Sequence, residues 1–349
     1  MRKFLACISP PRLIGAGLLT TLSSASLAAG FALIEQSASQ MGNAFAGGAA
    51  FAGDASTVFF NPAGMTRLPA QVVGGLHYVK PKGEFDGTAT DITGGAISGG
   101  NGGDAGQVGV IPNLYITVPL GEGLFAGLGI NVPFGLSTKY DANWKGRYHA
   151  IESEVSTINF NPSVAYKVNR QLSLGAGVNI QYINAKLTQA IDQGGLCTPT
   201  YLQLEAEGRL PPGSSIACTG LVPQGSDGFA EVEGDNWAGG YNLGLLYEPT
   251  NSTRVGLSYR SKIKQKLNGN SKFSNIIPQF SALGTFTNTS INAGIDLPQT
   301  ASFSVWHDLS SQWSVMADAT WTGWDNFQEL RVAFDSNQPD AVTEEDWDD

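Results

Sequence analysis

From Val72 onward, apolar residues alternate with small or polar residues along most of the chain. Between 171 and 180, for example, Leu172, Leu174 and Ala176 alternate with Ser173 and Gly175. Because successive side chains of a β-strand face opposite sides, this period of two predicts strands with one apolar face and one polar face. The same alternation marks 107–118, 124–132, 157–167, 237–247, 255–259 and 312–322.

The connections between these predicted strands alternate in length. Short turns are predicted at 120–123, 168–170, 249–252 and 308–311, and long connections near 81–106, 134–150, 189–230 and 267–290. Outer-membrane β-barrels have short periplasmic turns and long outer loops. The pattern therefore predicts about nine antiparallel strands, the first of which rises from the periplasmic side.

A soluble antiparallel sandwich is the main alternative, because its strands alternate too. Two observations favour a barrel. The polar faces are rich in Gly, Ser, Asn and Thr, as expected of a lumen wall. Aromatic residues stand at strand ends, as in the girdles of membrane barrels: Tyr166, Tyr182, Tyr247, Tyr259, Trp306, Trp313 and Trp321. We predict an all-β fold, a transmembrane antiparallel β-barrel.

Residues 1–28 have the pattern of a secretory signal peptide. Basic residues precede a short apolar core, and Ser26-Leu27-Ala28 is a small-x-small cleavage site, so the mature chain is expected to begin at Ala29. A membrane anchor or a buried core helix is the alternative. Three of the 20 basic residues lie in this segment, which leaves 17 against 30 acidic residues and a net charge of −13.

Charge and hydropathy exclude several classes of protein. An acidic chain does not fit nucleic-acid binding, which concentrates Lys and Arg, or a basic membrane-surface helix. No mature segment has 18 consecutive apolar residues, which excludes a helical membrane protein. Charged residues make up 14% of the chain, against about 25% in typical soluble domains, which agrees with a barrel that faces lipid.

The predicted ninth strand points outward again, whereas bacterial barrels normally have an even number of strands. An open sheet would leave unpaired backbone groups in hydrocarbon. The last residues, 344–349, are acidic and have no strand pattern. We therefore expect these residues to be a C-terminally truncated barrel.

Two cysteines, Cys197 and Cys218, remain in the mature chain, both in one long polar connection. In an oxidising compartment we expect them to form a disulfide. Metal ligation is the alternative, but neither a His nor a second Cys pair is nearby.

Residues 29–70 lack the period of two and are rich in Gly, Ala and Ser. We interpret this segment as a hatch inside the lumen, followed by the barrel at 71–349. Its last part, Asn61-Pro62-Ala63, reads as a helix start, because Asn caps helices and Pro suits the first helical position.

Several motifs together resemble one family: Ala29-Gly30-Phe31, Gly53–Met65, Asn131–Leu136, Tyr241–Tyr247 and Val255–Ser261. The chain resembles the long-chain fatty-acid transporters of Gram-negative outer membranes, the FadL type, which include aromatic-hydrocarbon transporters. The resemblance runs from the signal to Asp349. It implies a 14-strand barrel with an N-terminal hatch, apolar ligand pockets and a lateral opening at a kink in the third strand.

The kink would lie at Asn131, Pro133, Phe134 and Gly135, since Pro has no N–H for the ladder and Gly weakens a strand. Alternatively, the strand simply ends at Pro133 and enters its outer loop. The candidate hatch and ligand-binding residues are Phe31, Leu33, Phe45, Asn61, Pro62 and Ala63. Where family members can carry a basic residue for the ligand carboxylate, this chain has Gln189, so Lys186, Arg260 or Lys262 is the candidate contact.

The resulting hypothesis is passive outer-membrane transport of long-chain fatty acids or other hydrophobic compounds, with lateral exit at the strand-three break. Uptake of aromatic hydrocarbons, a general porin and a structural surface protein are the alternatives. We expect no enzyme, cofactor or metal site, since His77, His149 and His307 are far apart and no catalytic motif occurs. The expected partners are the hydrophobic ligand, outer-membrane lipid and lipopolysaccharide, and the barrel-assembly machinery, and the expected state is a monomer.

Overall fold

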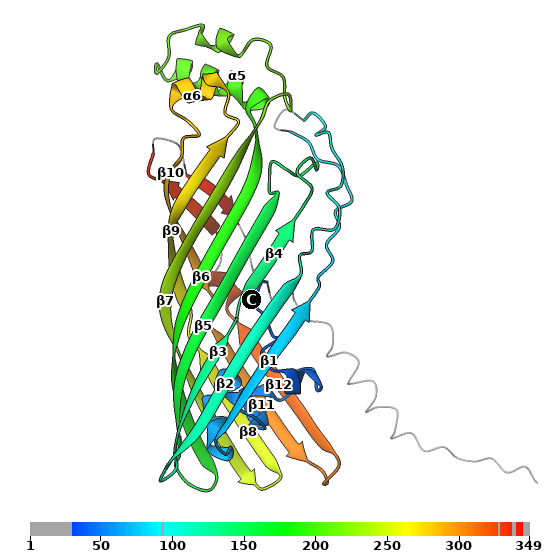
Figure 1. The fold of residues 1–349 in the computed structure, drawn as a ribbon, viewed down its shortest axis with the longest axis vertical. Coiled ribbons are helices and arrows are strands. Elements are labelled where there is room, and N and C mark those ends of the chain that lie inside the picture. The colour runs from blue at the N-terminus through cyan, green and yellow to red at the C-terminus, as the bar shows by residue number, and fades with distance from the viewer. Residues whose placement is uncertain (1–29, 92–93, 327–328, 337–339, 345–349) are drawn as a thin grey trace, which may run out of the picture.

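The computed structural model describes residues 30–91, 94–326, 329–336 and 340–344 (Figure 1). The predicted signal peptide lies outside these ranges. The described residues form one antiparallel sheet, curved into a wall around the N-terminal segment. None of the helices in these ranges is long and apolar enough to cross a membrane.

The sheet contains 14 strand segments. They are β1 (Gln71–Val79), β2 (Gly109–Gly121), β3 (Leu124–Asn131), β4 (Gly135–Lys139), β5 (Glu152–Lys167), β6 (Leu172–Asp192), β7 (Asp227–Thr250), β8 (Thr253–Arg260), β9 (Ile263–Ser274), β10 (Thr289–Leu297), β11 (Thr300–Asp308), β12 (Ser314–Thr322), β13 (Glu329–Phe334) and β14 (Ala341–Glu344). The main order is β1-β2-β3-β5-β6-β7-β9-β10-β13-β14; β4 pairs with β5, β8 with β7 and β11, and β11 with β12.

Segments β1 to β13 make up nine strands that run from one end of the sheet to the other. Four of these strands consist of two segments each: β3 with β4, β8 with β9, β10 with β11, and β12 with β13. Only the first of these interruptions, at 132–134, was expected from the sequence. The segment β14 was not expected, because the acidic end of the chain has no alternation, yet it pairs with β13 from Glu329↔Glu344 to Val332↔Ala341.

The predicted alternation of loop lengths is confirmed. Short turns at 122–123, 168–171, 251–252 and 309–313 lie at one end of the sheet. Long connections at 80–108, 140–151, 193–226 and 275–288 lie at the other end, and two of them carry α5 (Gln193–Ala206), η2 (Ser214–Cys218) and α6 (Pro278–Leu283).

The two faces of β5 differ as the alternation predicts. On β5 the inner residues Thr157, Asn159 and Asn161 are buried, whereas Val164 and Tyr166 on the outer face are exposed. The exposed aromatic residues Trp237, Tyr241, Tyr247, Trp313 and Trp321 belong to this outer face. Trp306 was wrongly grouped with them: it shares the inner face with Ser304 and packs against Phe51 of the N-terminal segment, with ring centroids 5.6 Å apart.

Residues 31–68, here called the N-terminal segment, form α2 (Ala38–Met41), α3 (Gly48–Phe51), α4 (Thr57–Phe60) and η1 (Pro62–Arg67). The η1 helix contacts β3, β5, β6 and β7, and α3 contacts β8 and β11, so the segment packs against a continuous run of neighbouring strands. The predicted helix start is confirmed: the Asn61 side chain caps η1 by accepting a hydrogen bond from Ala63 N, and Pro62 is its first residue.

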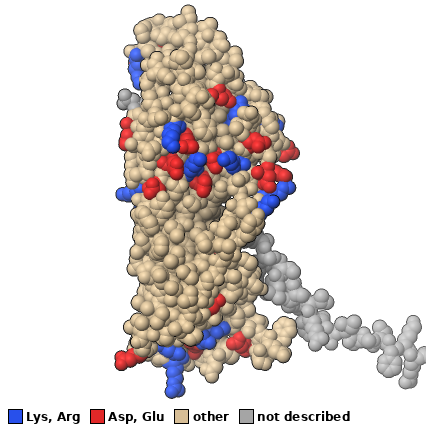
Figure 2. Space-filling model, in the orientation of Figure 1, with Lys and Arg blue, Asp and Glu red and all other residues tan. Residues whose placement is uncertain are grey.

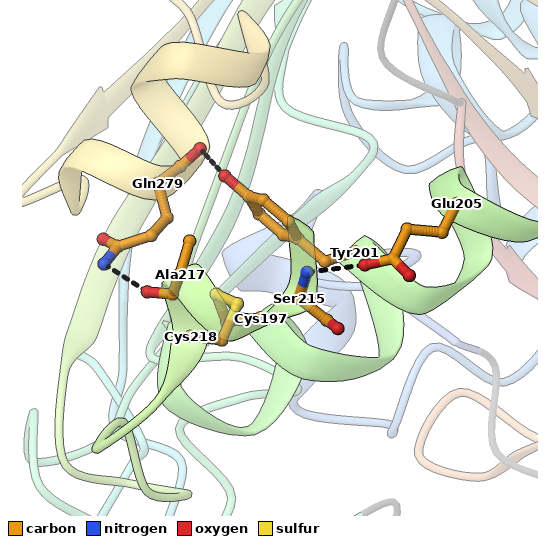
Figure 3. Close-up of a disulfide and its surroundings, with 7 residues drawn as sticks. All are labelled: Cys197, Tyr201, Glu205, Ser215, Ala217, Cys218 and Gln279. Atoms are coloured by element: carbon orange, nitrogen blue, oxygen red, sulfur yellow. Dashed lines mark hydrogen bonds between the residues drawn. A yellow bond between two sulfur atoms is a disulfide. The ribbon is translucent and has the colours of Figure 1, made fainter. Parts of the chain in front are cut away.

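A disulfide joins Cys197 in α5 to Cys218 in η2, the pairing expected from the sequence (Figure 3). Around it, Tyr201 donates a hydrogen bond to the Gln279 carbonyl at 2.9 Å, and Gln279 Nε2 donates one to the Ala217 carbonyl at 3.0 Å. These contacts join two of the long connections into one cap at the outer end.

Candidate functional site

The inner face of β6 passes through three layers of different chemistry. Ser173 and Gly175 contact the N-terminal segment, Asn179 and Gln181 lie in a polar layer, and Ile183 belongs to an apolar cluster. A strand rises about 3.3 Å per residue, so about 13 Å separates Asn179 from Ile183. The space inside the wall is therefore polar near the N-terminal segment and apolar further toward the loops.

The N-terminal segment is held to the wall by close backbone contact. Asn61 Nδ2 donates hydrogen bonds to the carbonyls of Leu245 (2.9 Å) and Ala49 (2.6 Å). A Cβ on Gly175 would lie 2.6 Å from the Pro62 carbonyl carbon, and one on Gly244 would lie 2.9 Å from Pro62 Cδ. Glycines at these two wall positions thus make room for the Asn61-Pro62-Ala63 turn.

Side-chain contacts reinforce this attachment. Thr66 Oγ1 donates a hydrogen bond to Ser173 Oγ at 2.7 Å, and Arg67 forms an ion pair with Glu248. On β11, the Ala49 N–H donates to Ser304 Oγ at 3.1 Å. These bonds attach η1 to β6 and β7, and α3 to β11, which is separated from β7 only by β8.

The polar layer is a network of buried amides. Asn159 Nδ2 donates to Asn179 Oδ1 at 3.1 Å, and Asn161 Nδ2 donates to Asn242 Oδ1 at 2.8 Å. Asn159 Oδ1, Asn161 Oδ1, Asn242 Nδ2 and Gln181 Nε2 have no hydrogen-bond partner within the described residues. Buried polar atoms normally have partners, so this layer can accept hydrogen bonds from, and donate them to, a bound molecule.

Arg260 extends into the polar layer from the end of β8. Its guanidinium donates to the Asn179 side chain and, at 2.9 Å, to the Phe59 carbonyl, and it lies 4.4 Å from the centre of the Phe59 ring. In the part of the chain that the structure describes, no ion pair with a carboxylate neutralises it. Arg260 thus provides a positive charge beside neutral amides, on the short-turn side of the apolar cluster.

The apolar cluster consists of buried side chains from β6, β9 and β10, from two interruptions of the wall and from the start of the N-terminal segment. Its members are Phe31, Phe134, Ile183, Ile263, Leu267, Ile295, Leu297 and Trp324. The ring centroid of Phe31 lies 5.8 Å from that of Phe134 and 5.2 Å from that of Trp324, both in edge-on geometry. Phe134 comes from the break between β3 and β4, and Trp324 from that between β12 and β13. Phe31 therefore occupies the space between two interruptions of the wall.

At the first break the N-terminal segment pairs directly with the wall. Leu33 N–H donates to the Pro133 carbonyl and Gly135 N–H to the Phe31 carbonyl, each at 2.9 Å, around an antiparallel bridge between Ala32 and Phe134. Gln36 Nε2 donates to the Val132 carbonyl at 2.7 Å. Residues 31–36 thus satisfy backbone groups that the interrupted strand leaves unpaired.

The structure brings some of the predicted residues together and separates others. Phe31, Leu33, Pro133, Phe134 and Gly135 meet at the first break. Asn131, at the end of β3, accepts a hydrogen bond from Asn159 in the polar layer at 3.3 Å. Phe45 lies elsewhere, stacked on Phe60 with ring centroids 6.3 Å apart, and Asn61, Pro62 and Ala63 contact the wall instead of the apolar cluster.

Lys186 was wrongly proposed as a contact for a ligand inside the barrel. It shares the outer face of β6 with Val178 and Ile180, and its Nζ pairs with Glu152 at 3.4 Å and Glu231 at 3.6 Å. Gln189 is exposed near the outer end of β6. Lys262 is paired with Asp296 at 3.5 Å and Asn326 at 2.8 Å, which leaves Arg260 as the basic candidate in the polar layer.

Sequence reasoning missed Trp324 and the wall residues of the apolar cluster. Ile263 and Leu267 lie on one face of β9, and Ile295 and Leu297 on one face of β10. They alternate with the charged residues Lys264, Lys266 and Asp296, so the assumption that the apolar face of a strand points to lipid would place them on the wrong side. The described residues contain no group of three or more His, Cys, Asp or Glu side chains that could hold a metal ion.

A one-sheet wall with apolar outer residues, short turns at one end and a packed interior segment defines an outer-membrane transport barrel. The comparisons identify the family. The family described as outer membrane protein transport protein (OMPP1/FadL/TodX) matches residues 19–349, and the chain belongs to it. The resemblance inferred from the motifs is confirmed, and so are the fold class and the outer-membrane location.

Individual relatives agree with this assignment. The chain is 30% identical to a long-chain fatty acid transport protein of Escherichia coli O6:H1 over 91% of this chain and 71% of that protein. It is 30% identical to outer membrane protein P1 of Haemophilus influenzae over 89% of this chain and 69% of the relative. These relatives are outer-membrane proteins, not enzymes, as expected.

Two solved structures show the same architecture. A Pseudomonas aeruginosa FadL homologue has a TM-score of 0.77 at 28% identity, over 88% of this chain and 72% of that one. The toluene transporter TbuX of Ralstonia pickettii has a TM-score of 0.59 at 19% identity, over 86% of this chain and 77% of that one, which shows likeness of fold.

Proposed function

We propose that the protein carries long-chain fatty acids or related hydrophobic compounds passively across the outer membrane. The observation that carries this proposal is the apolar cluster beside a polar layer that holds Arg260. An amphipathic acid fits both: its chain would replace Phe31 among the apolar side chains, and its carboxylate would accept hydrogen bonds from the guanidinium and the amides. A hydrogen bond to a charged group contributes about 1.5–3 kcal/mol.

In this proposal residues 29–70 act as the hatch and residues 71–349 as the barrel wall. The hatch blocks a straight aqueous path, and the ligand leaves sideways at the break between β3 and β4. Support comes from the bridge between Ala32 and Phe134, which closes that break with only two backbone hydrogen bonds. Each is worth about 1 kcal/mol net, so the N-terminal residues could detach and reattach during transport.

The names of the relatives point to two ligand classes, fatty acids and toluene. Arg260 favours an acid, because an aromatic hydrocarbon has no group for a guanidinium to bind. Uptake of aromatic hydrocarbons by the same route is therefore the second candidate, favoured if Arg260 proves dispensable. We also expect the protein to contact outer-membrane lipid and lipopolysaccharide, to be inserted by the barrel-assembly machinery and to be a monomer.

A general porin or a structural surface protein is less well supported. The contacts of Asn61, Thr66 and Arg67 attach the N-terminal segment to the wall, and this obstructs the wide aqueous path that a porin needs. Steady large ion currents through the purified full-length protein in planar bilayers would favour the porin instead.

A reversible cross-link tests the lateral route. Ala32 and Phe134 form a non-hydrogen-bonded antiparallel pair, a geometry with Cα atoms about 4.5 Å apart that accepts a disulfide. The double variant Ala32→Cys/Phe134→Cys would be expressed as the full-length protein in a strain without its own transporter. We expect oleate uptake to fall to background after oxidation and to recover after reduction.

Each single cysteine variant, and the wild type treated with the same reductant, control for the loss of the Phe134 ring and for reduction of the native disulfide. Full uptake by the oxidised, cross-linked protein would rule out the lateral route while leaving transport itself intact. The absence of oleate and toluene uptake by the wild type would reject the proposed function.

A further inference from the structure

An Asn-Gly pair, Asn101-Gly102, lies where the 80–108 connection meets the 140–151 connection. Both connections lie at the outer end of the sheet, and Figure 2 shows charged side chains gathered in a band at their level, above a broad surface with almost none. Asn101 is exposed, and a bridge between Gly100 and Trp144 pairs the two connections beside it. The Asn101 side chain is therefore in contact with water.

The backbone of Gly102 leaves its nitrogen accessible to the side chain that precedes it. Gly102 has no Cβ and a φ of 89°, in the left-handed region. Its carbonyl accepts a hydrogen bond from Asp141 N–H at 3.0 Å, but within the described residues its own N–H has no hydrogen-bond acceptor. Attack by this nitrogen on Asn101 Cγ closes a five-membered ring, and reactions within one molecule avoid the entropy cost of bringing two molecules together.

Two charged groups hold and polarise the Asn101 side chain. Lys145 Nζ donates a hydrogen bond to its Oδ1 at 2.9 Å, and its Nδ2 donates one to Asp86 Oδ1 at 3.3 Å. An ammonium group beside Oδ1 stabilises the negative charge that develops on this oxygen when Cγ is attacked. The contact with Lys145 therefore lowers the barrier to attack on this amide.

A second Asn-Gly pair, Asn268-Gly269 in β9, provides a comparison within the same chain. The Asn268 side chain is also exposed. Gly269 lies between two ladder partners, Gly234 on β7 and Ile291 on β10, so its N–H is bound within the sheet. Its nitrogen would have to leave the ladder before it could attack. The two pairs thus have the same sequence and different backbone surroundings.

We propose that Asn101 is a site of spontaneous deamidation, and this proposal does not depend on the transport function. The Gly102 nitrogen bonds to Asn101 Cγ and gives up its proton, the Cγ–Nδ2 bond breaks, and ammonia leaves behind a succinimide. Water then opens the ring, with its hydroxyl on one carbonyl carbon and its proton on the nitrogen. Opening at Cγ gives aspartate, and opening at the main-chain carbonyl gives isoaspartate, in which the chain runs through Cγ.

The two products differ in their effect on the junction between the connections. Aspartate keeps the backbone unchanged and places a carboxylate beside Lys145. Isoaspartate inserts one methylene between Gly100 and Gly102, whose carbonyls accept hydrogen bonds from the N–H groups of Lys145 and Asp141, each at 3.0 Å. Since a longer backbone cannot keep both hydrogen bonds in register, isoaspartate should loosen the junction.

The test incubates the purified full-length protein in a neutral detergent at physiological pH and temperature. Peptide mass spectrometry, with fragmentation that separates aspartate from isoaspartate, follows both Asn-Gly pairs over time. We expect Asn101 to convert at least about tenfold faster than Asn268, which corresponds to about 1.4 kcal/mol in activation free energy. We also expect proteolysis within 94–106 to increase with the isoaspartate content.

Two variants separate the reaction from its consequence. Asn101→Gln keeps the amide but needs a larger ring for the same attack, so its junction should stay resistant to protease during the incubation. Asn101→Asp carries the product with a normal backbone and should begin as resistant as the wild type.

Four results would overturn the proposal. They are no conversion of Asn101, conversion of Asn268 at the same rate, equal protease sensitivity of the incubated wild type and Asn101→Gln, and a stable product that has lost ammonia without gaining water. The last result would mean that Lys145 Nζ, instead of the Gly102 nitrogen, attacks Cγ and joins the two connections by an amide bond.

Discussion

The fit between the wall glycines and the N-terminal segment predicts the effect of adding one methyl group. In Gly175→Ala the new Cβ would lie 2.6 Å from the Pro62 carbonyl carbon, whereas carbon atoms in good contact are about 3.5–4.0 Å apart. The Asn61-Pro62-Ala63 turn would have to retreat by about 1 Å. Overpacking of this kind costs about 1–3 kcal/mol, and a displaced turn would also weaken the Asn61 hydrogen bond to the Leu245 carbonyl.

If the N-terminal segment acts as the proposed hatch, a cost of about 2 kcal/mol borne by its docked state would raise the population of the undocked state about thirtyfold. Planar-bilayer recording of the full-length protein measures this population as the fraction of time that ions pass. Gly294→Ala is the matched control, because a Cβ at that position has no neighbour within 4 Å. If Gly175→Ala conducts no more than Gly294→Ala, the close fit does not hold the hatch in place.

Three further predictions concern the binding site and the outer cap. Arg260→Gln should weaken oleate uptake about ten- to hundredfold at limiting concentration, by loss of a charge-assisted hydrogen bond, and leave toluene uptake within about threefold; equal losses for both would assign Arg260 a structural role. Cys197→Ser/Cys218→Ser should make the 193–226 connection sensitive to protease, since closing this loop is worth about 3 kcal/mol. The barrel itself should stay folded, so its heat-modifiable mobility on gels should match that of the wild type. The Gly213 and Ser215 N–H groups lower the pKa of the Glu205 carboxyl, so its contribution to the cap is present above the ordinary glutamate pKa and lost as the pH falls through the lowered value; hydrogen exchange in 193–226 should increase there, and Glu205→Gln should abolish the dependence.

Much of the wall could be predicted because lipid and lumen impose different chemistry on the two faces of every strand. That difference repeats at each second residue, as on β5 and β6, and the loop lengths add the orientation. Two of the other interruptions contain the residue types that marked the first one, Pro298 at 298–299 and Gly323 directly after β12, and could have been inferred in the same way; the interruption at 261–262 contains neither Pro nor Gly.

The candidate site was predictable only in part, and Lys186 shows why. Strand parity alone places Lys186 with Val178 and Ile180 on the lipid face. It became a candidate only because it is a basic residue close in sequence to Gln189, where family members can carry a basic residue. Trp324 shows the opposite problem. It contacts Phe31 and Phe134, which precede it by 293 and 190 residues, and no short-range pattern contains that information.

The position of Phe31 has a consequence for how tightly any ligand can bind. A ligand that enters the apolar cluster competes with a side chain that is part of the same molecule. For a short tether the effective concentration of such a competitor is in the millimolar range, and every ligand must overcome it. Long chains, which bury more CH₂ groups at about 0.8 kcal/mol each, overcome it more readily than short ones. Under the proposed function, the tethered phenyl ring would thus favour long ligands over short ones through competition, without any narrowing of the pore.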